Sequence, residues 1–264
     1  MRLVIKVGTS LIAPGGRIDT RQLRSLVDQL DLPHHEFLIV SSGAIASGMT
    51  NLGLKEKPTK VRLMQACAAV GQSALMHTYE QVFFGKKIVA QLLLSSDDFT
   101  TAARYKNLQN TLDQLLRLGV VPIVNENDSV SVRELEGAFG DNDELSALLA
   151  TAVNADWLLL LTDVDGFLVP NGSKKPRLVR VVRKLTAALE AQCNGKSKLG
   201  RGGMISKLKA AKLASEAGVH VAIVNGRNPA GITLGMERKI GTYFPPHSPR
   251  RHVPRHVPSD REKS

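Results

Sequence analysis

The chain has 264 residues, of which 43% are hydrophobic, enough for one large α/β domain or two closely packed lobes. This composition excludes global disorder, and an aromatic content of only 4% favours a core of Val, Ile and Leu. The net charge of +11 is concentrated, because eleven basic residues and one acid lie between Lys174 and Ala210. Such a segment indicates a local anion site, and its lack of aromatic residues favours nucleotide phosphates over nucleic acid.

Short apolar runs that favour strands alternate along the chain with stretches that have the spacing of helices. Strands are predicted at 3–7, 37–40, 88–94, 120–124, 156–161 and 219–224, and helices at 20–30, 61–84, 101–118, 144–153 and 205–217. Asp19 or Thr20 is the expected cap of the first helix, and 129–139 is an expected exposed excursion. The alternation predicts an α/β fold with a mostly parallel central sheet sandwiched by helices.

The two cysteines, Cys67 and Cys193, form no C-x-x-C pair, so no disulfide framework or zinc site is predicted. Cys67 lies in an apolar helical run and is expected to be a small buried residue. The first residues do not read as a signal peptide, and the longest apolar run, 157–161, is too short to span a bilayer. We therefore expect a cytoplasmic protein without a membrane partner.

Polar and glycine-rich clusters follow four of the predicted strands. They are Gly8-Thr9-Ser10, Ser41-Ser42-Gly43, Asn125 to Asp128, and Thr162-Asp163, and the segment from Gly140 to Asp143 comes shortly after the third. Open parallel sheets bind ligands at the carboxyl ends of their strands. The clusters therefore predict a single long active-site crevice along that edge.

Two lysines suit phosphoryl transfer when they are taken together. Lys6 ends the first strand beside Gly8, and Lys207 lies one turn inside a helix that follows Gly202-Gly203. A helix N-terminus presents free N–H groups and the positive end of its dipole to phosphate. Either lysine alone is more simply a strand-end or solvated residue. Two converging ammonium groups, held by Asp143, would offset the charge on a transferring phosphoryl group.

Several segments together resemble the amino-acid kinase family, and within it the members that phosphorylate L-glutamate. They follow the family's order over about residues 1–244. The most specific evidence is the pair of segments Asn125-Glu126-Asn127-Asp128 and Gly140-Asp141-Asn142-Asp143. Lys6-x-Gly8 alone would be weak evidence. The remaining matches are Ser41 to Gly48, Ala69-Val70-Gly71-Gln72, Thr162-Asp163 with Gly166, and Gly202-Gly203-Met204 with Lys207.

The resemblance implies roles for individual residues. Lys6, Lys207 and Asp143 would be catalytic, with Asp143 orienting both lysines. The implied acceptor-binding residues are Ser42, Gly43, Asn125, Asp128, Asp141 and Asn142, and the implied ATP-binding residues are Lys6, Gly8, Thr9, Ser10, Thr162, Asp163, Arg201, Gly202, Gly203, Met204 and Lys207. Two alternatives stay open: Asp141 and Asn142 also sit where a helix N-cap is expected, and Arg201, which replaces the family's usual Thr, either reaches a phosphate or faces solvent.

The implied reaction is ATP plus L-glutamate giving ADP plus L-glutamyl 5-phosphate, the first step of proline biosynthesis. A carboxylate acceptor is already ionised at neutral pH, since its pKa is about 4.3, so no general base is needed. The resemblance also implies Mg²⁺ as a cofactor, with no protein-built metal site predicted. It further implies a homo-oligomer, inhibition by proline, and hand-over of the product to glutamyl-phosphate reductase, with no specific nucleic-acid partner.

The predicted kinase domain covers residues 1–245, with an acceptor-binding half over about 1–155 and a nucleotide-binding half over 156–245. Residues 246–264 are expected to be a basic, disordered tail, in a form without the C-terminal PUA domain that many members carry. The rival functions are acetylglutamate, carbamate or uridylate kinase, and a non-catalytic amino-acid-sensing or RNA-binding protein. The Asn125–Asp128 segment argues against the first group, and intact Lys6, Asp143 and Lys207 argue against the second.

Overall fold

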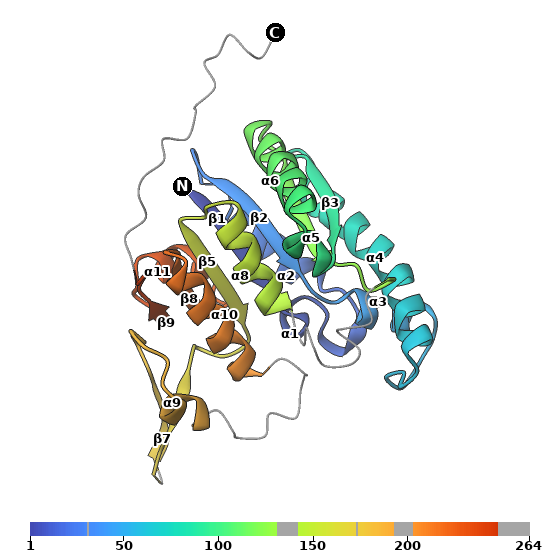
Figure 1. Cartoon of the computed structure of the whole chain (residues 1–264). Coiled ribbons are helices and arrows are strands. Elements are labelled where there is room, and N and C mark those ends of the chain that lie inside the picture. Colours follow the sequence, from blue (N-terminus) through green and yellow to red (C-terminus); the bar gives the residue numbers. More distant parts are fainter. Residues whose placement is uncertain (31, 131–141, 173, 193–202, 248–264) are drawn as a thin grey trace.

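The computed structural model describes residues 1–30, 32–130, 142–172, 174–192 and 203–247. In this part of the chain, seven strands form one sheet in the order β3-β4-β2-β1-β5-β8-β9 (Figure 1). All neighbouring pairs are parallel except β8 and β9. The strands are β1 Arg2–Val7, β2 Glu36–Ser41, β3 Val89–Leu94, β4 Val121–Glu126, β5 Trp157–Thr162, β8 His220–Asn225 and β9 Thr242–Phe244. The predicted fold class is confirmed.

Helices cover both faces of this sheet (Figure 1). Successive side chains of a strand point to opposite faces, so Val4 and Leu38 join one apolar core cluster and Leu3 and Phe37 join the other. The first cluster packs against α6, α8 and α10, and the second against α2, α4 and α11. The helices are α1 Thr9–Ile12, α2 Thr20–Asp28, α3 Ala44–Asn51, α4 Val61–Phe83, α5 Asp97–Thr100, α6 Ala102–Arg117, α8 Asn142–Ala152, α9 Ala187–Ala191, α10 Met204–Glu216 and α11 Gly231–Met236, with a 3₁₀ turn at Pro14–Gly16.

Several of these elements are absent from the sequence prediction. The largest is an antiparallel hairpin outside the main sheet, formed by β6 (Leu168–Asn171) and β7 (Lys174–Leu178). Most of its side chains are exposed, so no apolar alternation marks it. The edge strand β9 is only three residues long and is held by its pairing with β8. Elements this short carry too few side chains to show a period.

Four strands, β2, β4, β5 and β8, extend further at their carboxyl ends than predicted, because polar residues continue their ladders. Asn125 and Glu126 pair with Leu93 and Leu94, and Thr162 pairs with Asn225. Main-chain hydrogen bonds do not depend on side-chain polarity, so a strand that is read from apolar residues ends too early. These polar residues therefore sit on rigid strand ends instead of in the loops that follow them.

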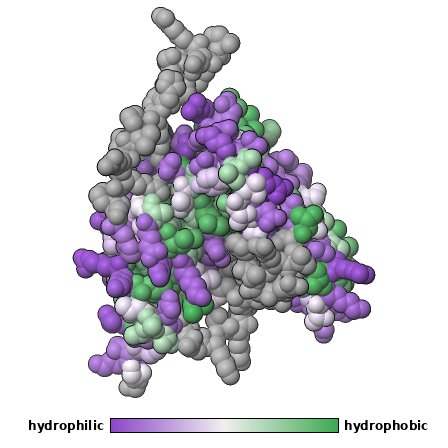
Figure 2. All heavy atoms as spheres, in the orientation of Figure 1, coloured by the Kyte–Doolittle hydropathy of each residue, from purple (hydrophilic) through white to green (hydrophobic). Residues whose placement is uncertain are grey.

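Asp19 caps α2 as predicted, since its side chain accepts hydrogen bonds from the main-chain N–H groups of Arg21 and Gln22. Most of the predicted excursion (131–139) and most of the predicted tail (248–264) lie outside the described residues. Across the described ranges, no helix is both long and apolar enough to cross a membrane. The face shown in Figure 2 is predominantly hydrophilic, with apolar residues in smaller groups.

Helices α3 and α4 approach so closely that two positions accommodate only glycine. A Cβ atom at Gly71 would lie 1.8 Å from the main-chain oxygen of Ala44, and one at Gly48 would lie 1.8 Å from that of Cys67. Both obstacles are main-chain atoms, so the two helices would have to move apart. We expect Gly71→Ala to lower the free energy of unfolding by about 3 kcal/mol, which corresponds to a fall in Tm of roughly 6–12 °C by thermal denaturation.

Ser73→Ala is the matched control, because Ser73 is exposed on the same helix. It should leave the Tm within about 1–2 °C of the native value, since surface substitutions rarely exceed about 0.5 kcal/mol. A Gly71→Ala protein as stable as the Ser73→Ala protein would contradict the close approach of α3 and α4. Cys67, which contributes one of these contacts, is fully buried as predicted.

Candidate active site

The strand order brings the predicted polar clusters to one edge of the sheet. The four strands that end in them, β4, β2, β1 and β5, are consecutive neighbours. From β1 the chain proceeds toward β2 and β4 on one side, while β5 and β8 lie on the other. This reversal of strand order is the place where open α/β sheets bind ligands, at the carboxyl ends of the strands. Lys6, on β1, lies at this reversal.

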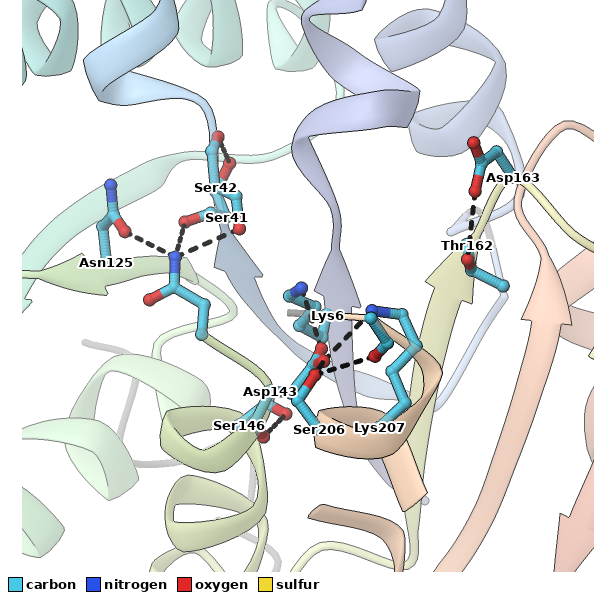
Figure 3. Close-up of polar contacts among 12 residues, drawn as sticks. Lys6, Ser41, Ser42, Asn125, Asp143, Ser146, Thr162, Asp163, Ser206 and Lys207 are labelled. Atoms are coloured by element: carbon cyan, nitrogen blue, oxygen red, sulfur yellow. Dashed lines mark hydrogen bonds and ion pairs between the residues drawn. The ribbon is translucent and has the colours of Figure 1, made fainter. Parts of the chain in front are cut away.

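Asp143 lies between two lysine ammonium groups that belong to distant parts of the chain (Figure 3). Its Oδ1 is 2.8 Å from Nζ of Lys6, and its Oδ2 is 3.0 Å from Nζ of Lys207. β1 supplies Lys6, α8 supplies Asp143 and α10 supplies Lys207. The arrangement in which one aspartate holds both lysines is therefore present as the sequence predicted.

Because the ion triad of Lys6, Asp143 and Lys207 is largely buried, the pKa of Asp143 depends strongly on the charges of the two lysines. Asp143 is 0% exposed and Lys6 1% exposed, while Lys207 remains partly open. Burial alone would raise the pKa of Asp143, but the charges of Lys6 and Lys207 outweigh it and hold that pKa well below its ordinary value. Ser206 assists by donating a 2.7 Å hydrogen bond from Oγ to Oδ2 of Asp143. Asp143 is thus a fixed anion that orients two cations.

A second group of side chains, beside the triad, consists of amides and serines. Asn142 directs its Nδ2 at three oxygens: the main-chain oxygen of Ser41 at 2.9 Å, Oγ of Ser42 at 3.2 Å and Oδ1 of Asn125 at 2.8 Å. Asn125 in turn donates from Nδ2 to Oε1 of Gln72 at 2.9 Å. The network joins β2, β4, α4 and α8, so it fixes the orientation of the amides of Asn125 and Asn142.

Among the described residues, three buried side-chain oxygens are without a hydrogen-bond partner, and one of them, Oδ1 of Asp143, forms the ion pair with Lys6. The other two are Oδ1 of Asn142 and Oδ1 of Asp128. An N-cap side chain accepts a hydrogen bond from the helix main chain, so the helix-cap interpretation of Asn142 is wrong. Leaving a buried acceptor unsatisfied costs about 1–3 kcal/mol, and a ligand with N–H donors would recover that cost.

Two of the predicted nucleotide-binding residues lie on the other side of the triad from the amides and serines. Figure 3 shows Thr162 and Asp163 across Lys6 and Lys207 from Asn125 and Ser42. Gly203 is the N-cap residue of α10, whose first residue is Met204. The helix therefore begins about one turn before Lys207 and directs its free N–H groups to the same region.

Gly8, after β1, and Gly43, after β2, differ in what glycine contributes to each loop. A Cβ atom at Gly8 would make only ordinary contacts, at 3.6 Å from the main-chain oxygen of Leu161 and 3.9 Å from Nζ of Lys6, so Gly8 places bare main chain beside that ammonium group. Thr9 and Ser10 follow it on α1. Gly43 has φ 99°, a conformation that favours glycine whatever it binds. Asp141, Arg201 and Gly202 lie outside the described residues.

Sequence reasoning assigned no role to Ser41, Gln72 and Ser206, which contact predicted site residues, or to Tyr79, which contacts Ser41. Gln72 belongs to a segment that matched the family, and Ser206 directly precedes Lys207, so both carried a weak signal in the sequence. Tyr79 carried none. Its hydroxyl donates to Oγ of Ser41 at 2.9 Å only because α4 packs this face against β2.

Comparison with known proteins gives relatives over nearly the whole chain. The model of the "Amino acid kinase family" matches residues 1–225. A glutamate 5-kinase of Geobacter sulfurreducens is 43% identical over 93% of this chain and 68% of its own length. A glutamate 5-kinase of Clostridium acetobutylicum is 42% identical over 93% of this chain and 94% of its own length. Relatives that share this name therefore include one of nearly the same extent as this chain.

A carbamate kinase from Giardia lamblia, solved with AMP-PNP, has a similar structure. The TM-score is 0.62 with 17% sequence identity, over 92% of this chain and 98% of the other. At this level of identity the likeness shows the fold alone.

Proposed function

The chain belongs to the amino acid kinase family, and we propose that it transfers the γ-phosphoryl group of ATP to the side-chain carboxylate of L-glutamate. The products are ADP and L-glutamyl 5-phosphate. The observation that carries the phosphoryl-transfer part of the proposal is the Lys6–Asp143–Lys207 triad at the carboxyl edge of the sheet. Relatives named glutamate 5-kinase, at 42–45% identity, support the choice of acceptor.

In the proposed reaction, a glutamate carboxylate oxygen forms a bond to the γ-phosphorus. The bond from that phosphorus to the β–γ bridging oxygen breaks, and its electron pair stays on ADP. The negative charge on the phosphoryl oxygens is stabilised by Lys6, which lies on β1, and by Lys207, which lies on α10. Asp143 holds both ammonium groups in place beforehand, so little reorganisation is needed as the charge shifts.

The acceptor needs no deprotonation, because a side-chain carboxylate with a pKa of about 4.3 is ionised at neutral pH. The site must therefore hold the acceptor in the correct position. Oδ1 of Asn142 and Oδ1 of Asp128, without partners among the described residues, suit the α-ammonium group of an amino acid. Oγ of Ser42 and the amide of Asn125 complete the proposed acceptor side. An acceptor without an ammonium group would leave these oxygens unsatisfied.

Mg²⁺ is proposed to accompany ATP. Within the described ranges, no three His, Cys, Asp or Glu side chains lie together as a metal cage. This fits Mg²⁺, which in kinases is held largely by substrate phosphates and water, with one or two carboxylates. Asp163 is a carboxylate on the proposed nucleotide side of the triad. When bound, the ion would neutralise phosphate charge, in addition to what the two lysines supply.

Other proposals rest on the family resemblance alone. They are a homo-oligomer, inhibition by proline, hand-over of the product to glutamyl-phosphate reductase, and a cytoplasmic location. The division into an acceptor-binding half (about 1–155) and a nucleotide-binding half (156–245) also remains a prediction. Figure 3 is compatible with such a division, since Ser42 and Thr162 lie on opposite sides of Lys6.

Release of ADP with a panel of acceptors tests the proposed reaction. The panel is L-glutamate, L-aspartate, N-acetylglutamate, carbamate and UMP, with ATP, Mg²⁺ and hydroxylamine, which traps an acyl phosphate as a hydroxamate. We expect hydroxamate with L-glutamate alone. Aspartate is one methylene too short to place its carboxylate at the triad, and N-acetylglutamate has no ammonium group for Asn142 and Asp128.

Two results would contradict the proposal. ADP release with UMP alone would assign the chain to a different member of the same fold. Equal hydroxamate yields from L-glutamate and N-acetylglutamate would leave the reaction type intact but remove the proposed role of the two unpartnered oxygens.

A further inference from the structure

We propose that Tyr79 is a positioning residue for the acceptor, acting through Ser41 on the Ser42–Asn142 contact; this inference rests on the proposed function. Tyr79 lies on α4, which packs on one face of the sheet, whereas Asn142 lies on α8 on the other face. Ser41, the last residue of β2, is contacted from both sides. Its side chain meets Tyr79, and its main-chain oxygen meets Asn142.

Hydrogen bonds to different atoms of Ser41 and Ser42 link Tyr79 to Asn142. The hydroxyl of Tyr79 donates to Oγ of Ser41 at 2.9 Å, and Oγ of Ser41 donates to the main-chain oxygen of Ser42 at 3.2 Å. The amide of Asn142 then donates to the main-chain oxygen of Ser41 and to Oγ of Ser42. Each hydrogen bond restricts the conformations that Ser41 or Ser42 can adopt. Ser42 belongs to the proposed acceptor side.

Burial makes these links strong constraints. Tyr79 and Ser41 are both 0% exposed, so water cannot replace either partner. Burial raises the pKa of Tyr79 far above its ordinary value, so the hydroxyl remains protonated and remains a donor. The direction of these hydrogen bonds is therefore fixed: Tyr79 donates to Ser41, which leaves the Ser41 proton for Ser42.

A buried tyrosine with a satisfied hydroxyl is also an ordinary structural feature, and Tyr243 provides the comparison. Tyr243 is 7% exposed, and its hydroxyl lies 2.8 Å from Nδ1 of His220, at the amino end of β8. This is the end of the sheet opposite the triad. Tyr243→Phe therefore removes a comparable hydrogen bond that has no connection to the acceptor site.

The test compares Tyr79→Phe with Tyr243→Phe in the hydroxamate assay and in thermal denaturation. Both variants should lose a similar amount of stability. Only Tyr79→Phe should raise the KM for L-glutamate, by about 3- to 10-fold, the equivalent of one hydrogen bond, while the KM for ATP stays unchanged. An unchanged glutamate KM in Tyr79→Phe would overturn the inference and leave the proposed function standing.

A double substitution separates positioning from stability. Ser41→Ala leaves the Tyr79 hydroxyl buried without an acceptor, so its Tm should fall further than that of Tyr79→Phe. Adding Tyr79→Phe removes the unsatisfied hydroxyl and should recover Tm, but the glutamate KM should stay raised. Recovery of KM together with Tm would overturn the inference. Absence of glutamate turnover in the wild-type protein would overturn the proposed function, and this inference with it.

Discussion

Replacing Asp143 with asparagine should lower kcat by about 10²-fold or more, without raising the KM for ATP. The variant keeps the shape of the side chain but removes the negative charge that pairs with both Lys6 and Lys207. The two ammonium groups then repel each other and lose their common anchor, so less of their charge is correctly placed in the transition state. Their attraction for bound ATP is not reduced, which is why the loss should appear in kcat.

Glu144→Gln is the matched control, because it removes one negative charge from an exposed neighbour on the same helix. It should leave kcat within about twofold, as expected of a surface substitution. An Asp143→Asn protein with near-normal kcat would remove the triad from the mechanism and leave the fold assignment unaffected.

The Asp143→Asn variant should also differ from the wild-type protein in how its stability depends on pH. The folded-state pKa of Asp143 lies below its unfolded value of about 3.9, so the ionised group stabilises the folded protein above about pH 4. This contribution is lost as the pH falls further, toward the folded-state pKa. The stability gap between the wild-type protein and Asp143→Asn should therefore be constant from pH 7 to about 5 and should narrow below about pH 4.

Removing either lysine charge should also reduce turnover by at least ~10²-fold, as for the loss of a single charge-stabilising donor. Methionine is the informative replacement at Lys6, which is 1% exposed, because it fills most of the space that alanine would leave empty. Lys207→Ala is suitable at the more open position. Since Lys207 lies one turn inside α10, at the proposed phosphate site, its loss should also raise the KM for ATP.

Lys209→Ala provides the control for Lys207→Ala, since Lys209 is an exposed lysine on the same helix and the loss of net charge is identical. It should retain near-normal kcat and KM. If Lys6→Met and Lys207→Ala both turned over at wild-type rates, the proposed charge stabilisation would be wrong.

The strands and helices that were predicted well are those in which apolar residues follow one clear local pattern. Six of the seven strands of the main sheet, and the long helices α4, α6, α8 and α10, are confirmed to within a few residues of each end. The errors have a common cause. Asn125, Glu126 and Thr162 belong to strands because main-chain pairing continues past the apolar run, and β9 exists because its neighbour β8 offers an edge.

For the candidate site, the sequence by itself determined the chemical groups: two lysines, one aspartate, and amide and glycine clusters placed after strands. Those follow from residue types and their order along the chain. Only the tertiary structure decided that Ser206 contacts Asp143, that Gln72 orients Asn125, and that Tyr79 contacts Ser41. These contacts join residues 38 to 63 positions apart. They depend on which face of α4 or α10 packs toward the sheet, and no local pattern in the sequence encodes that choice.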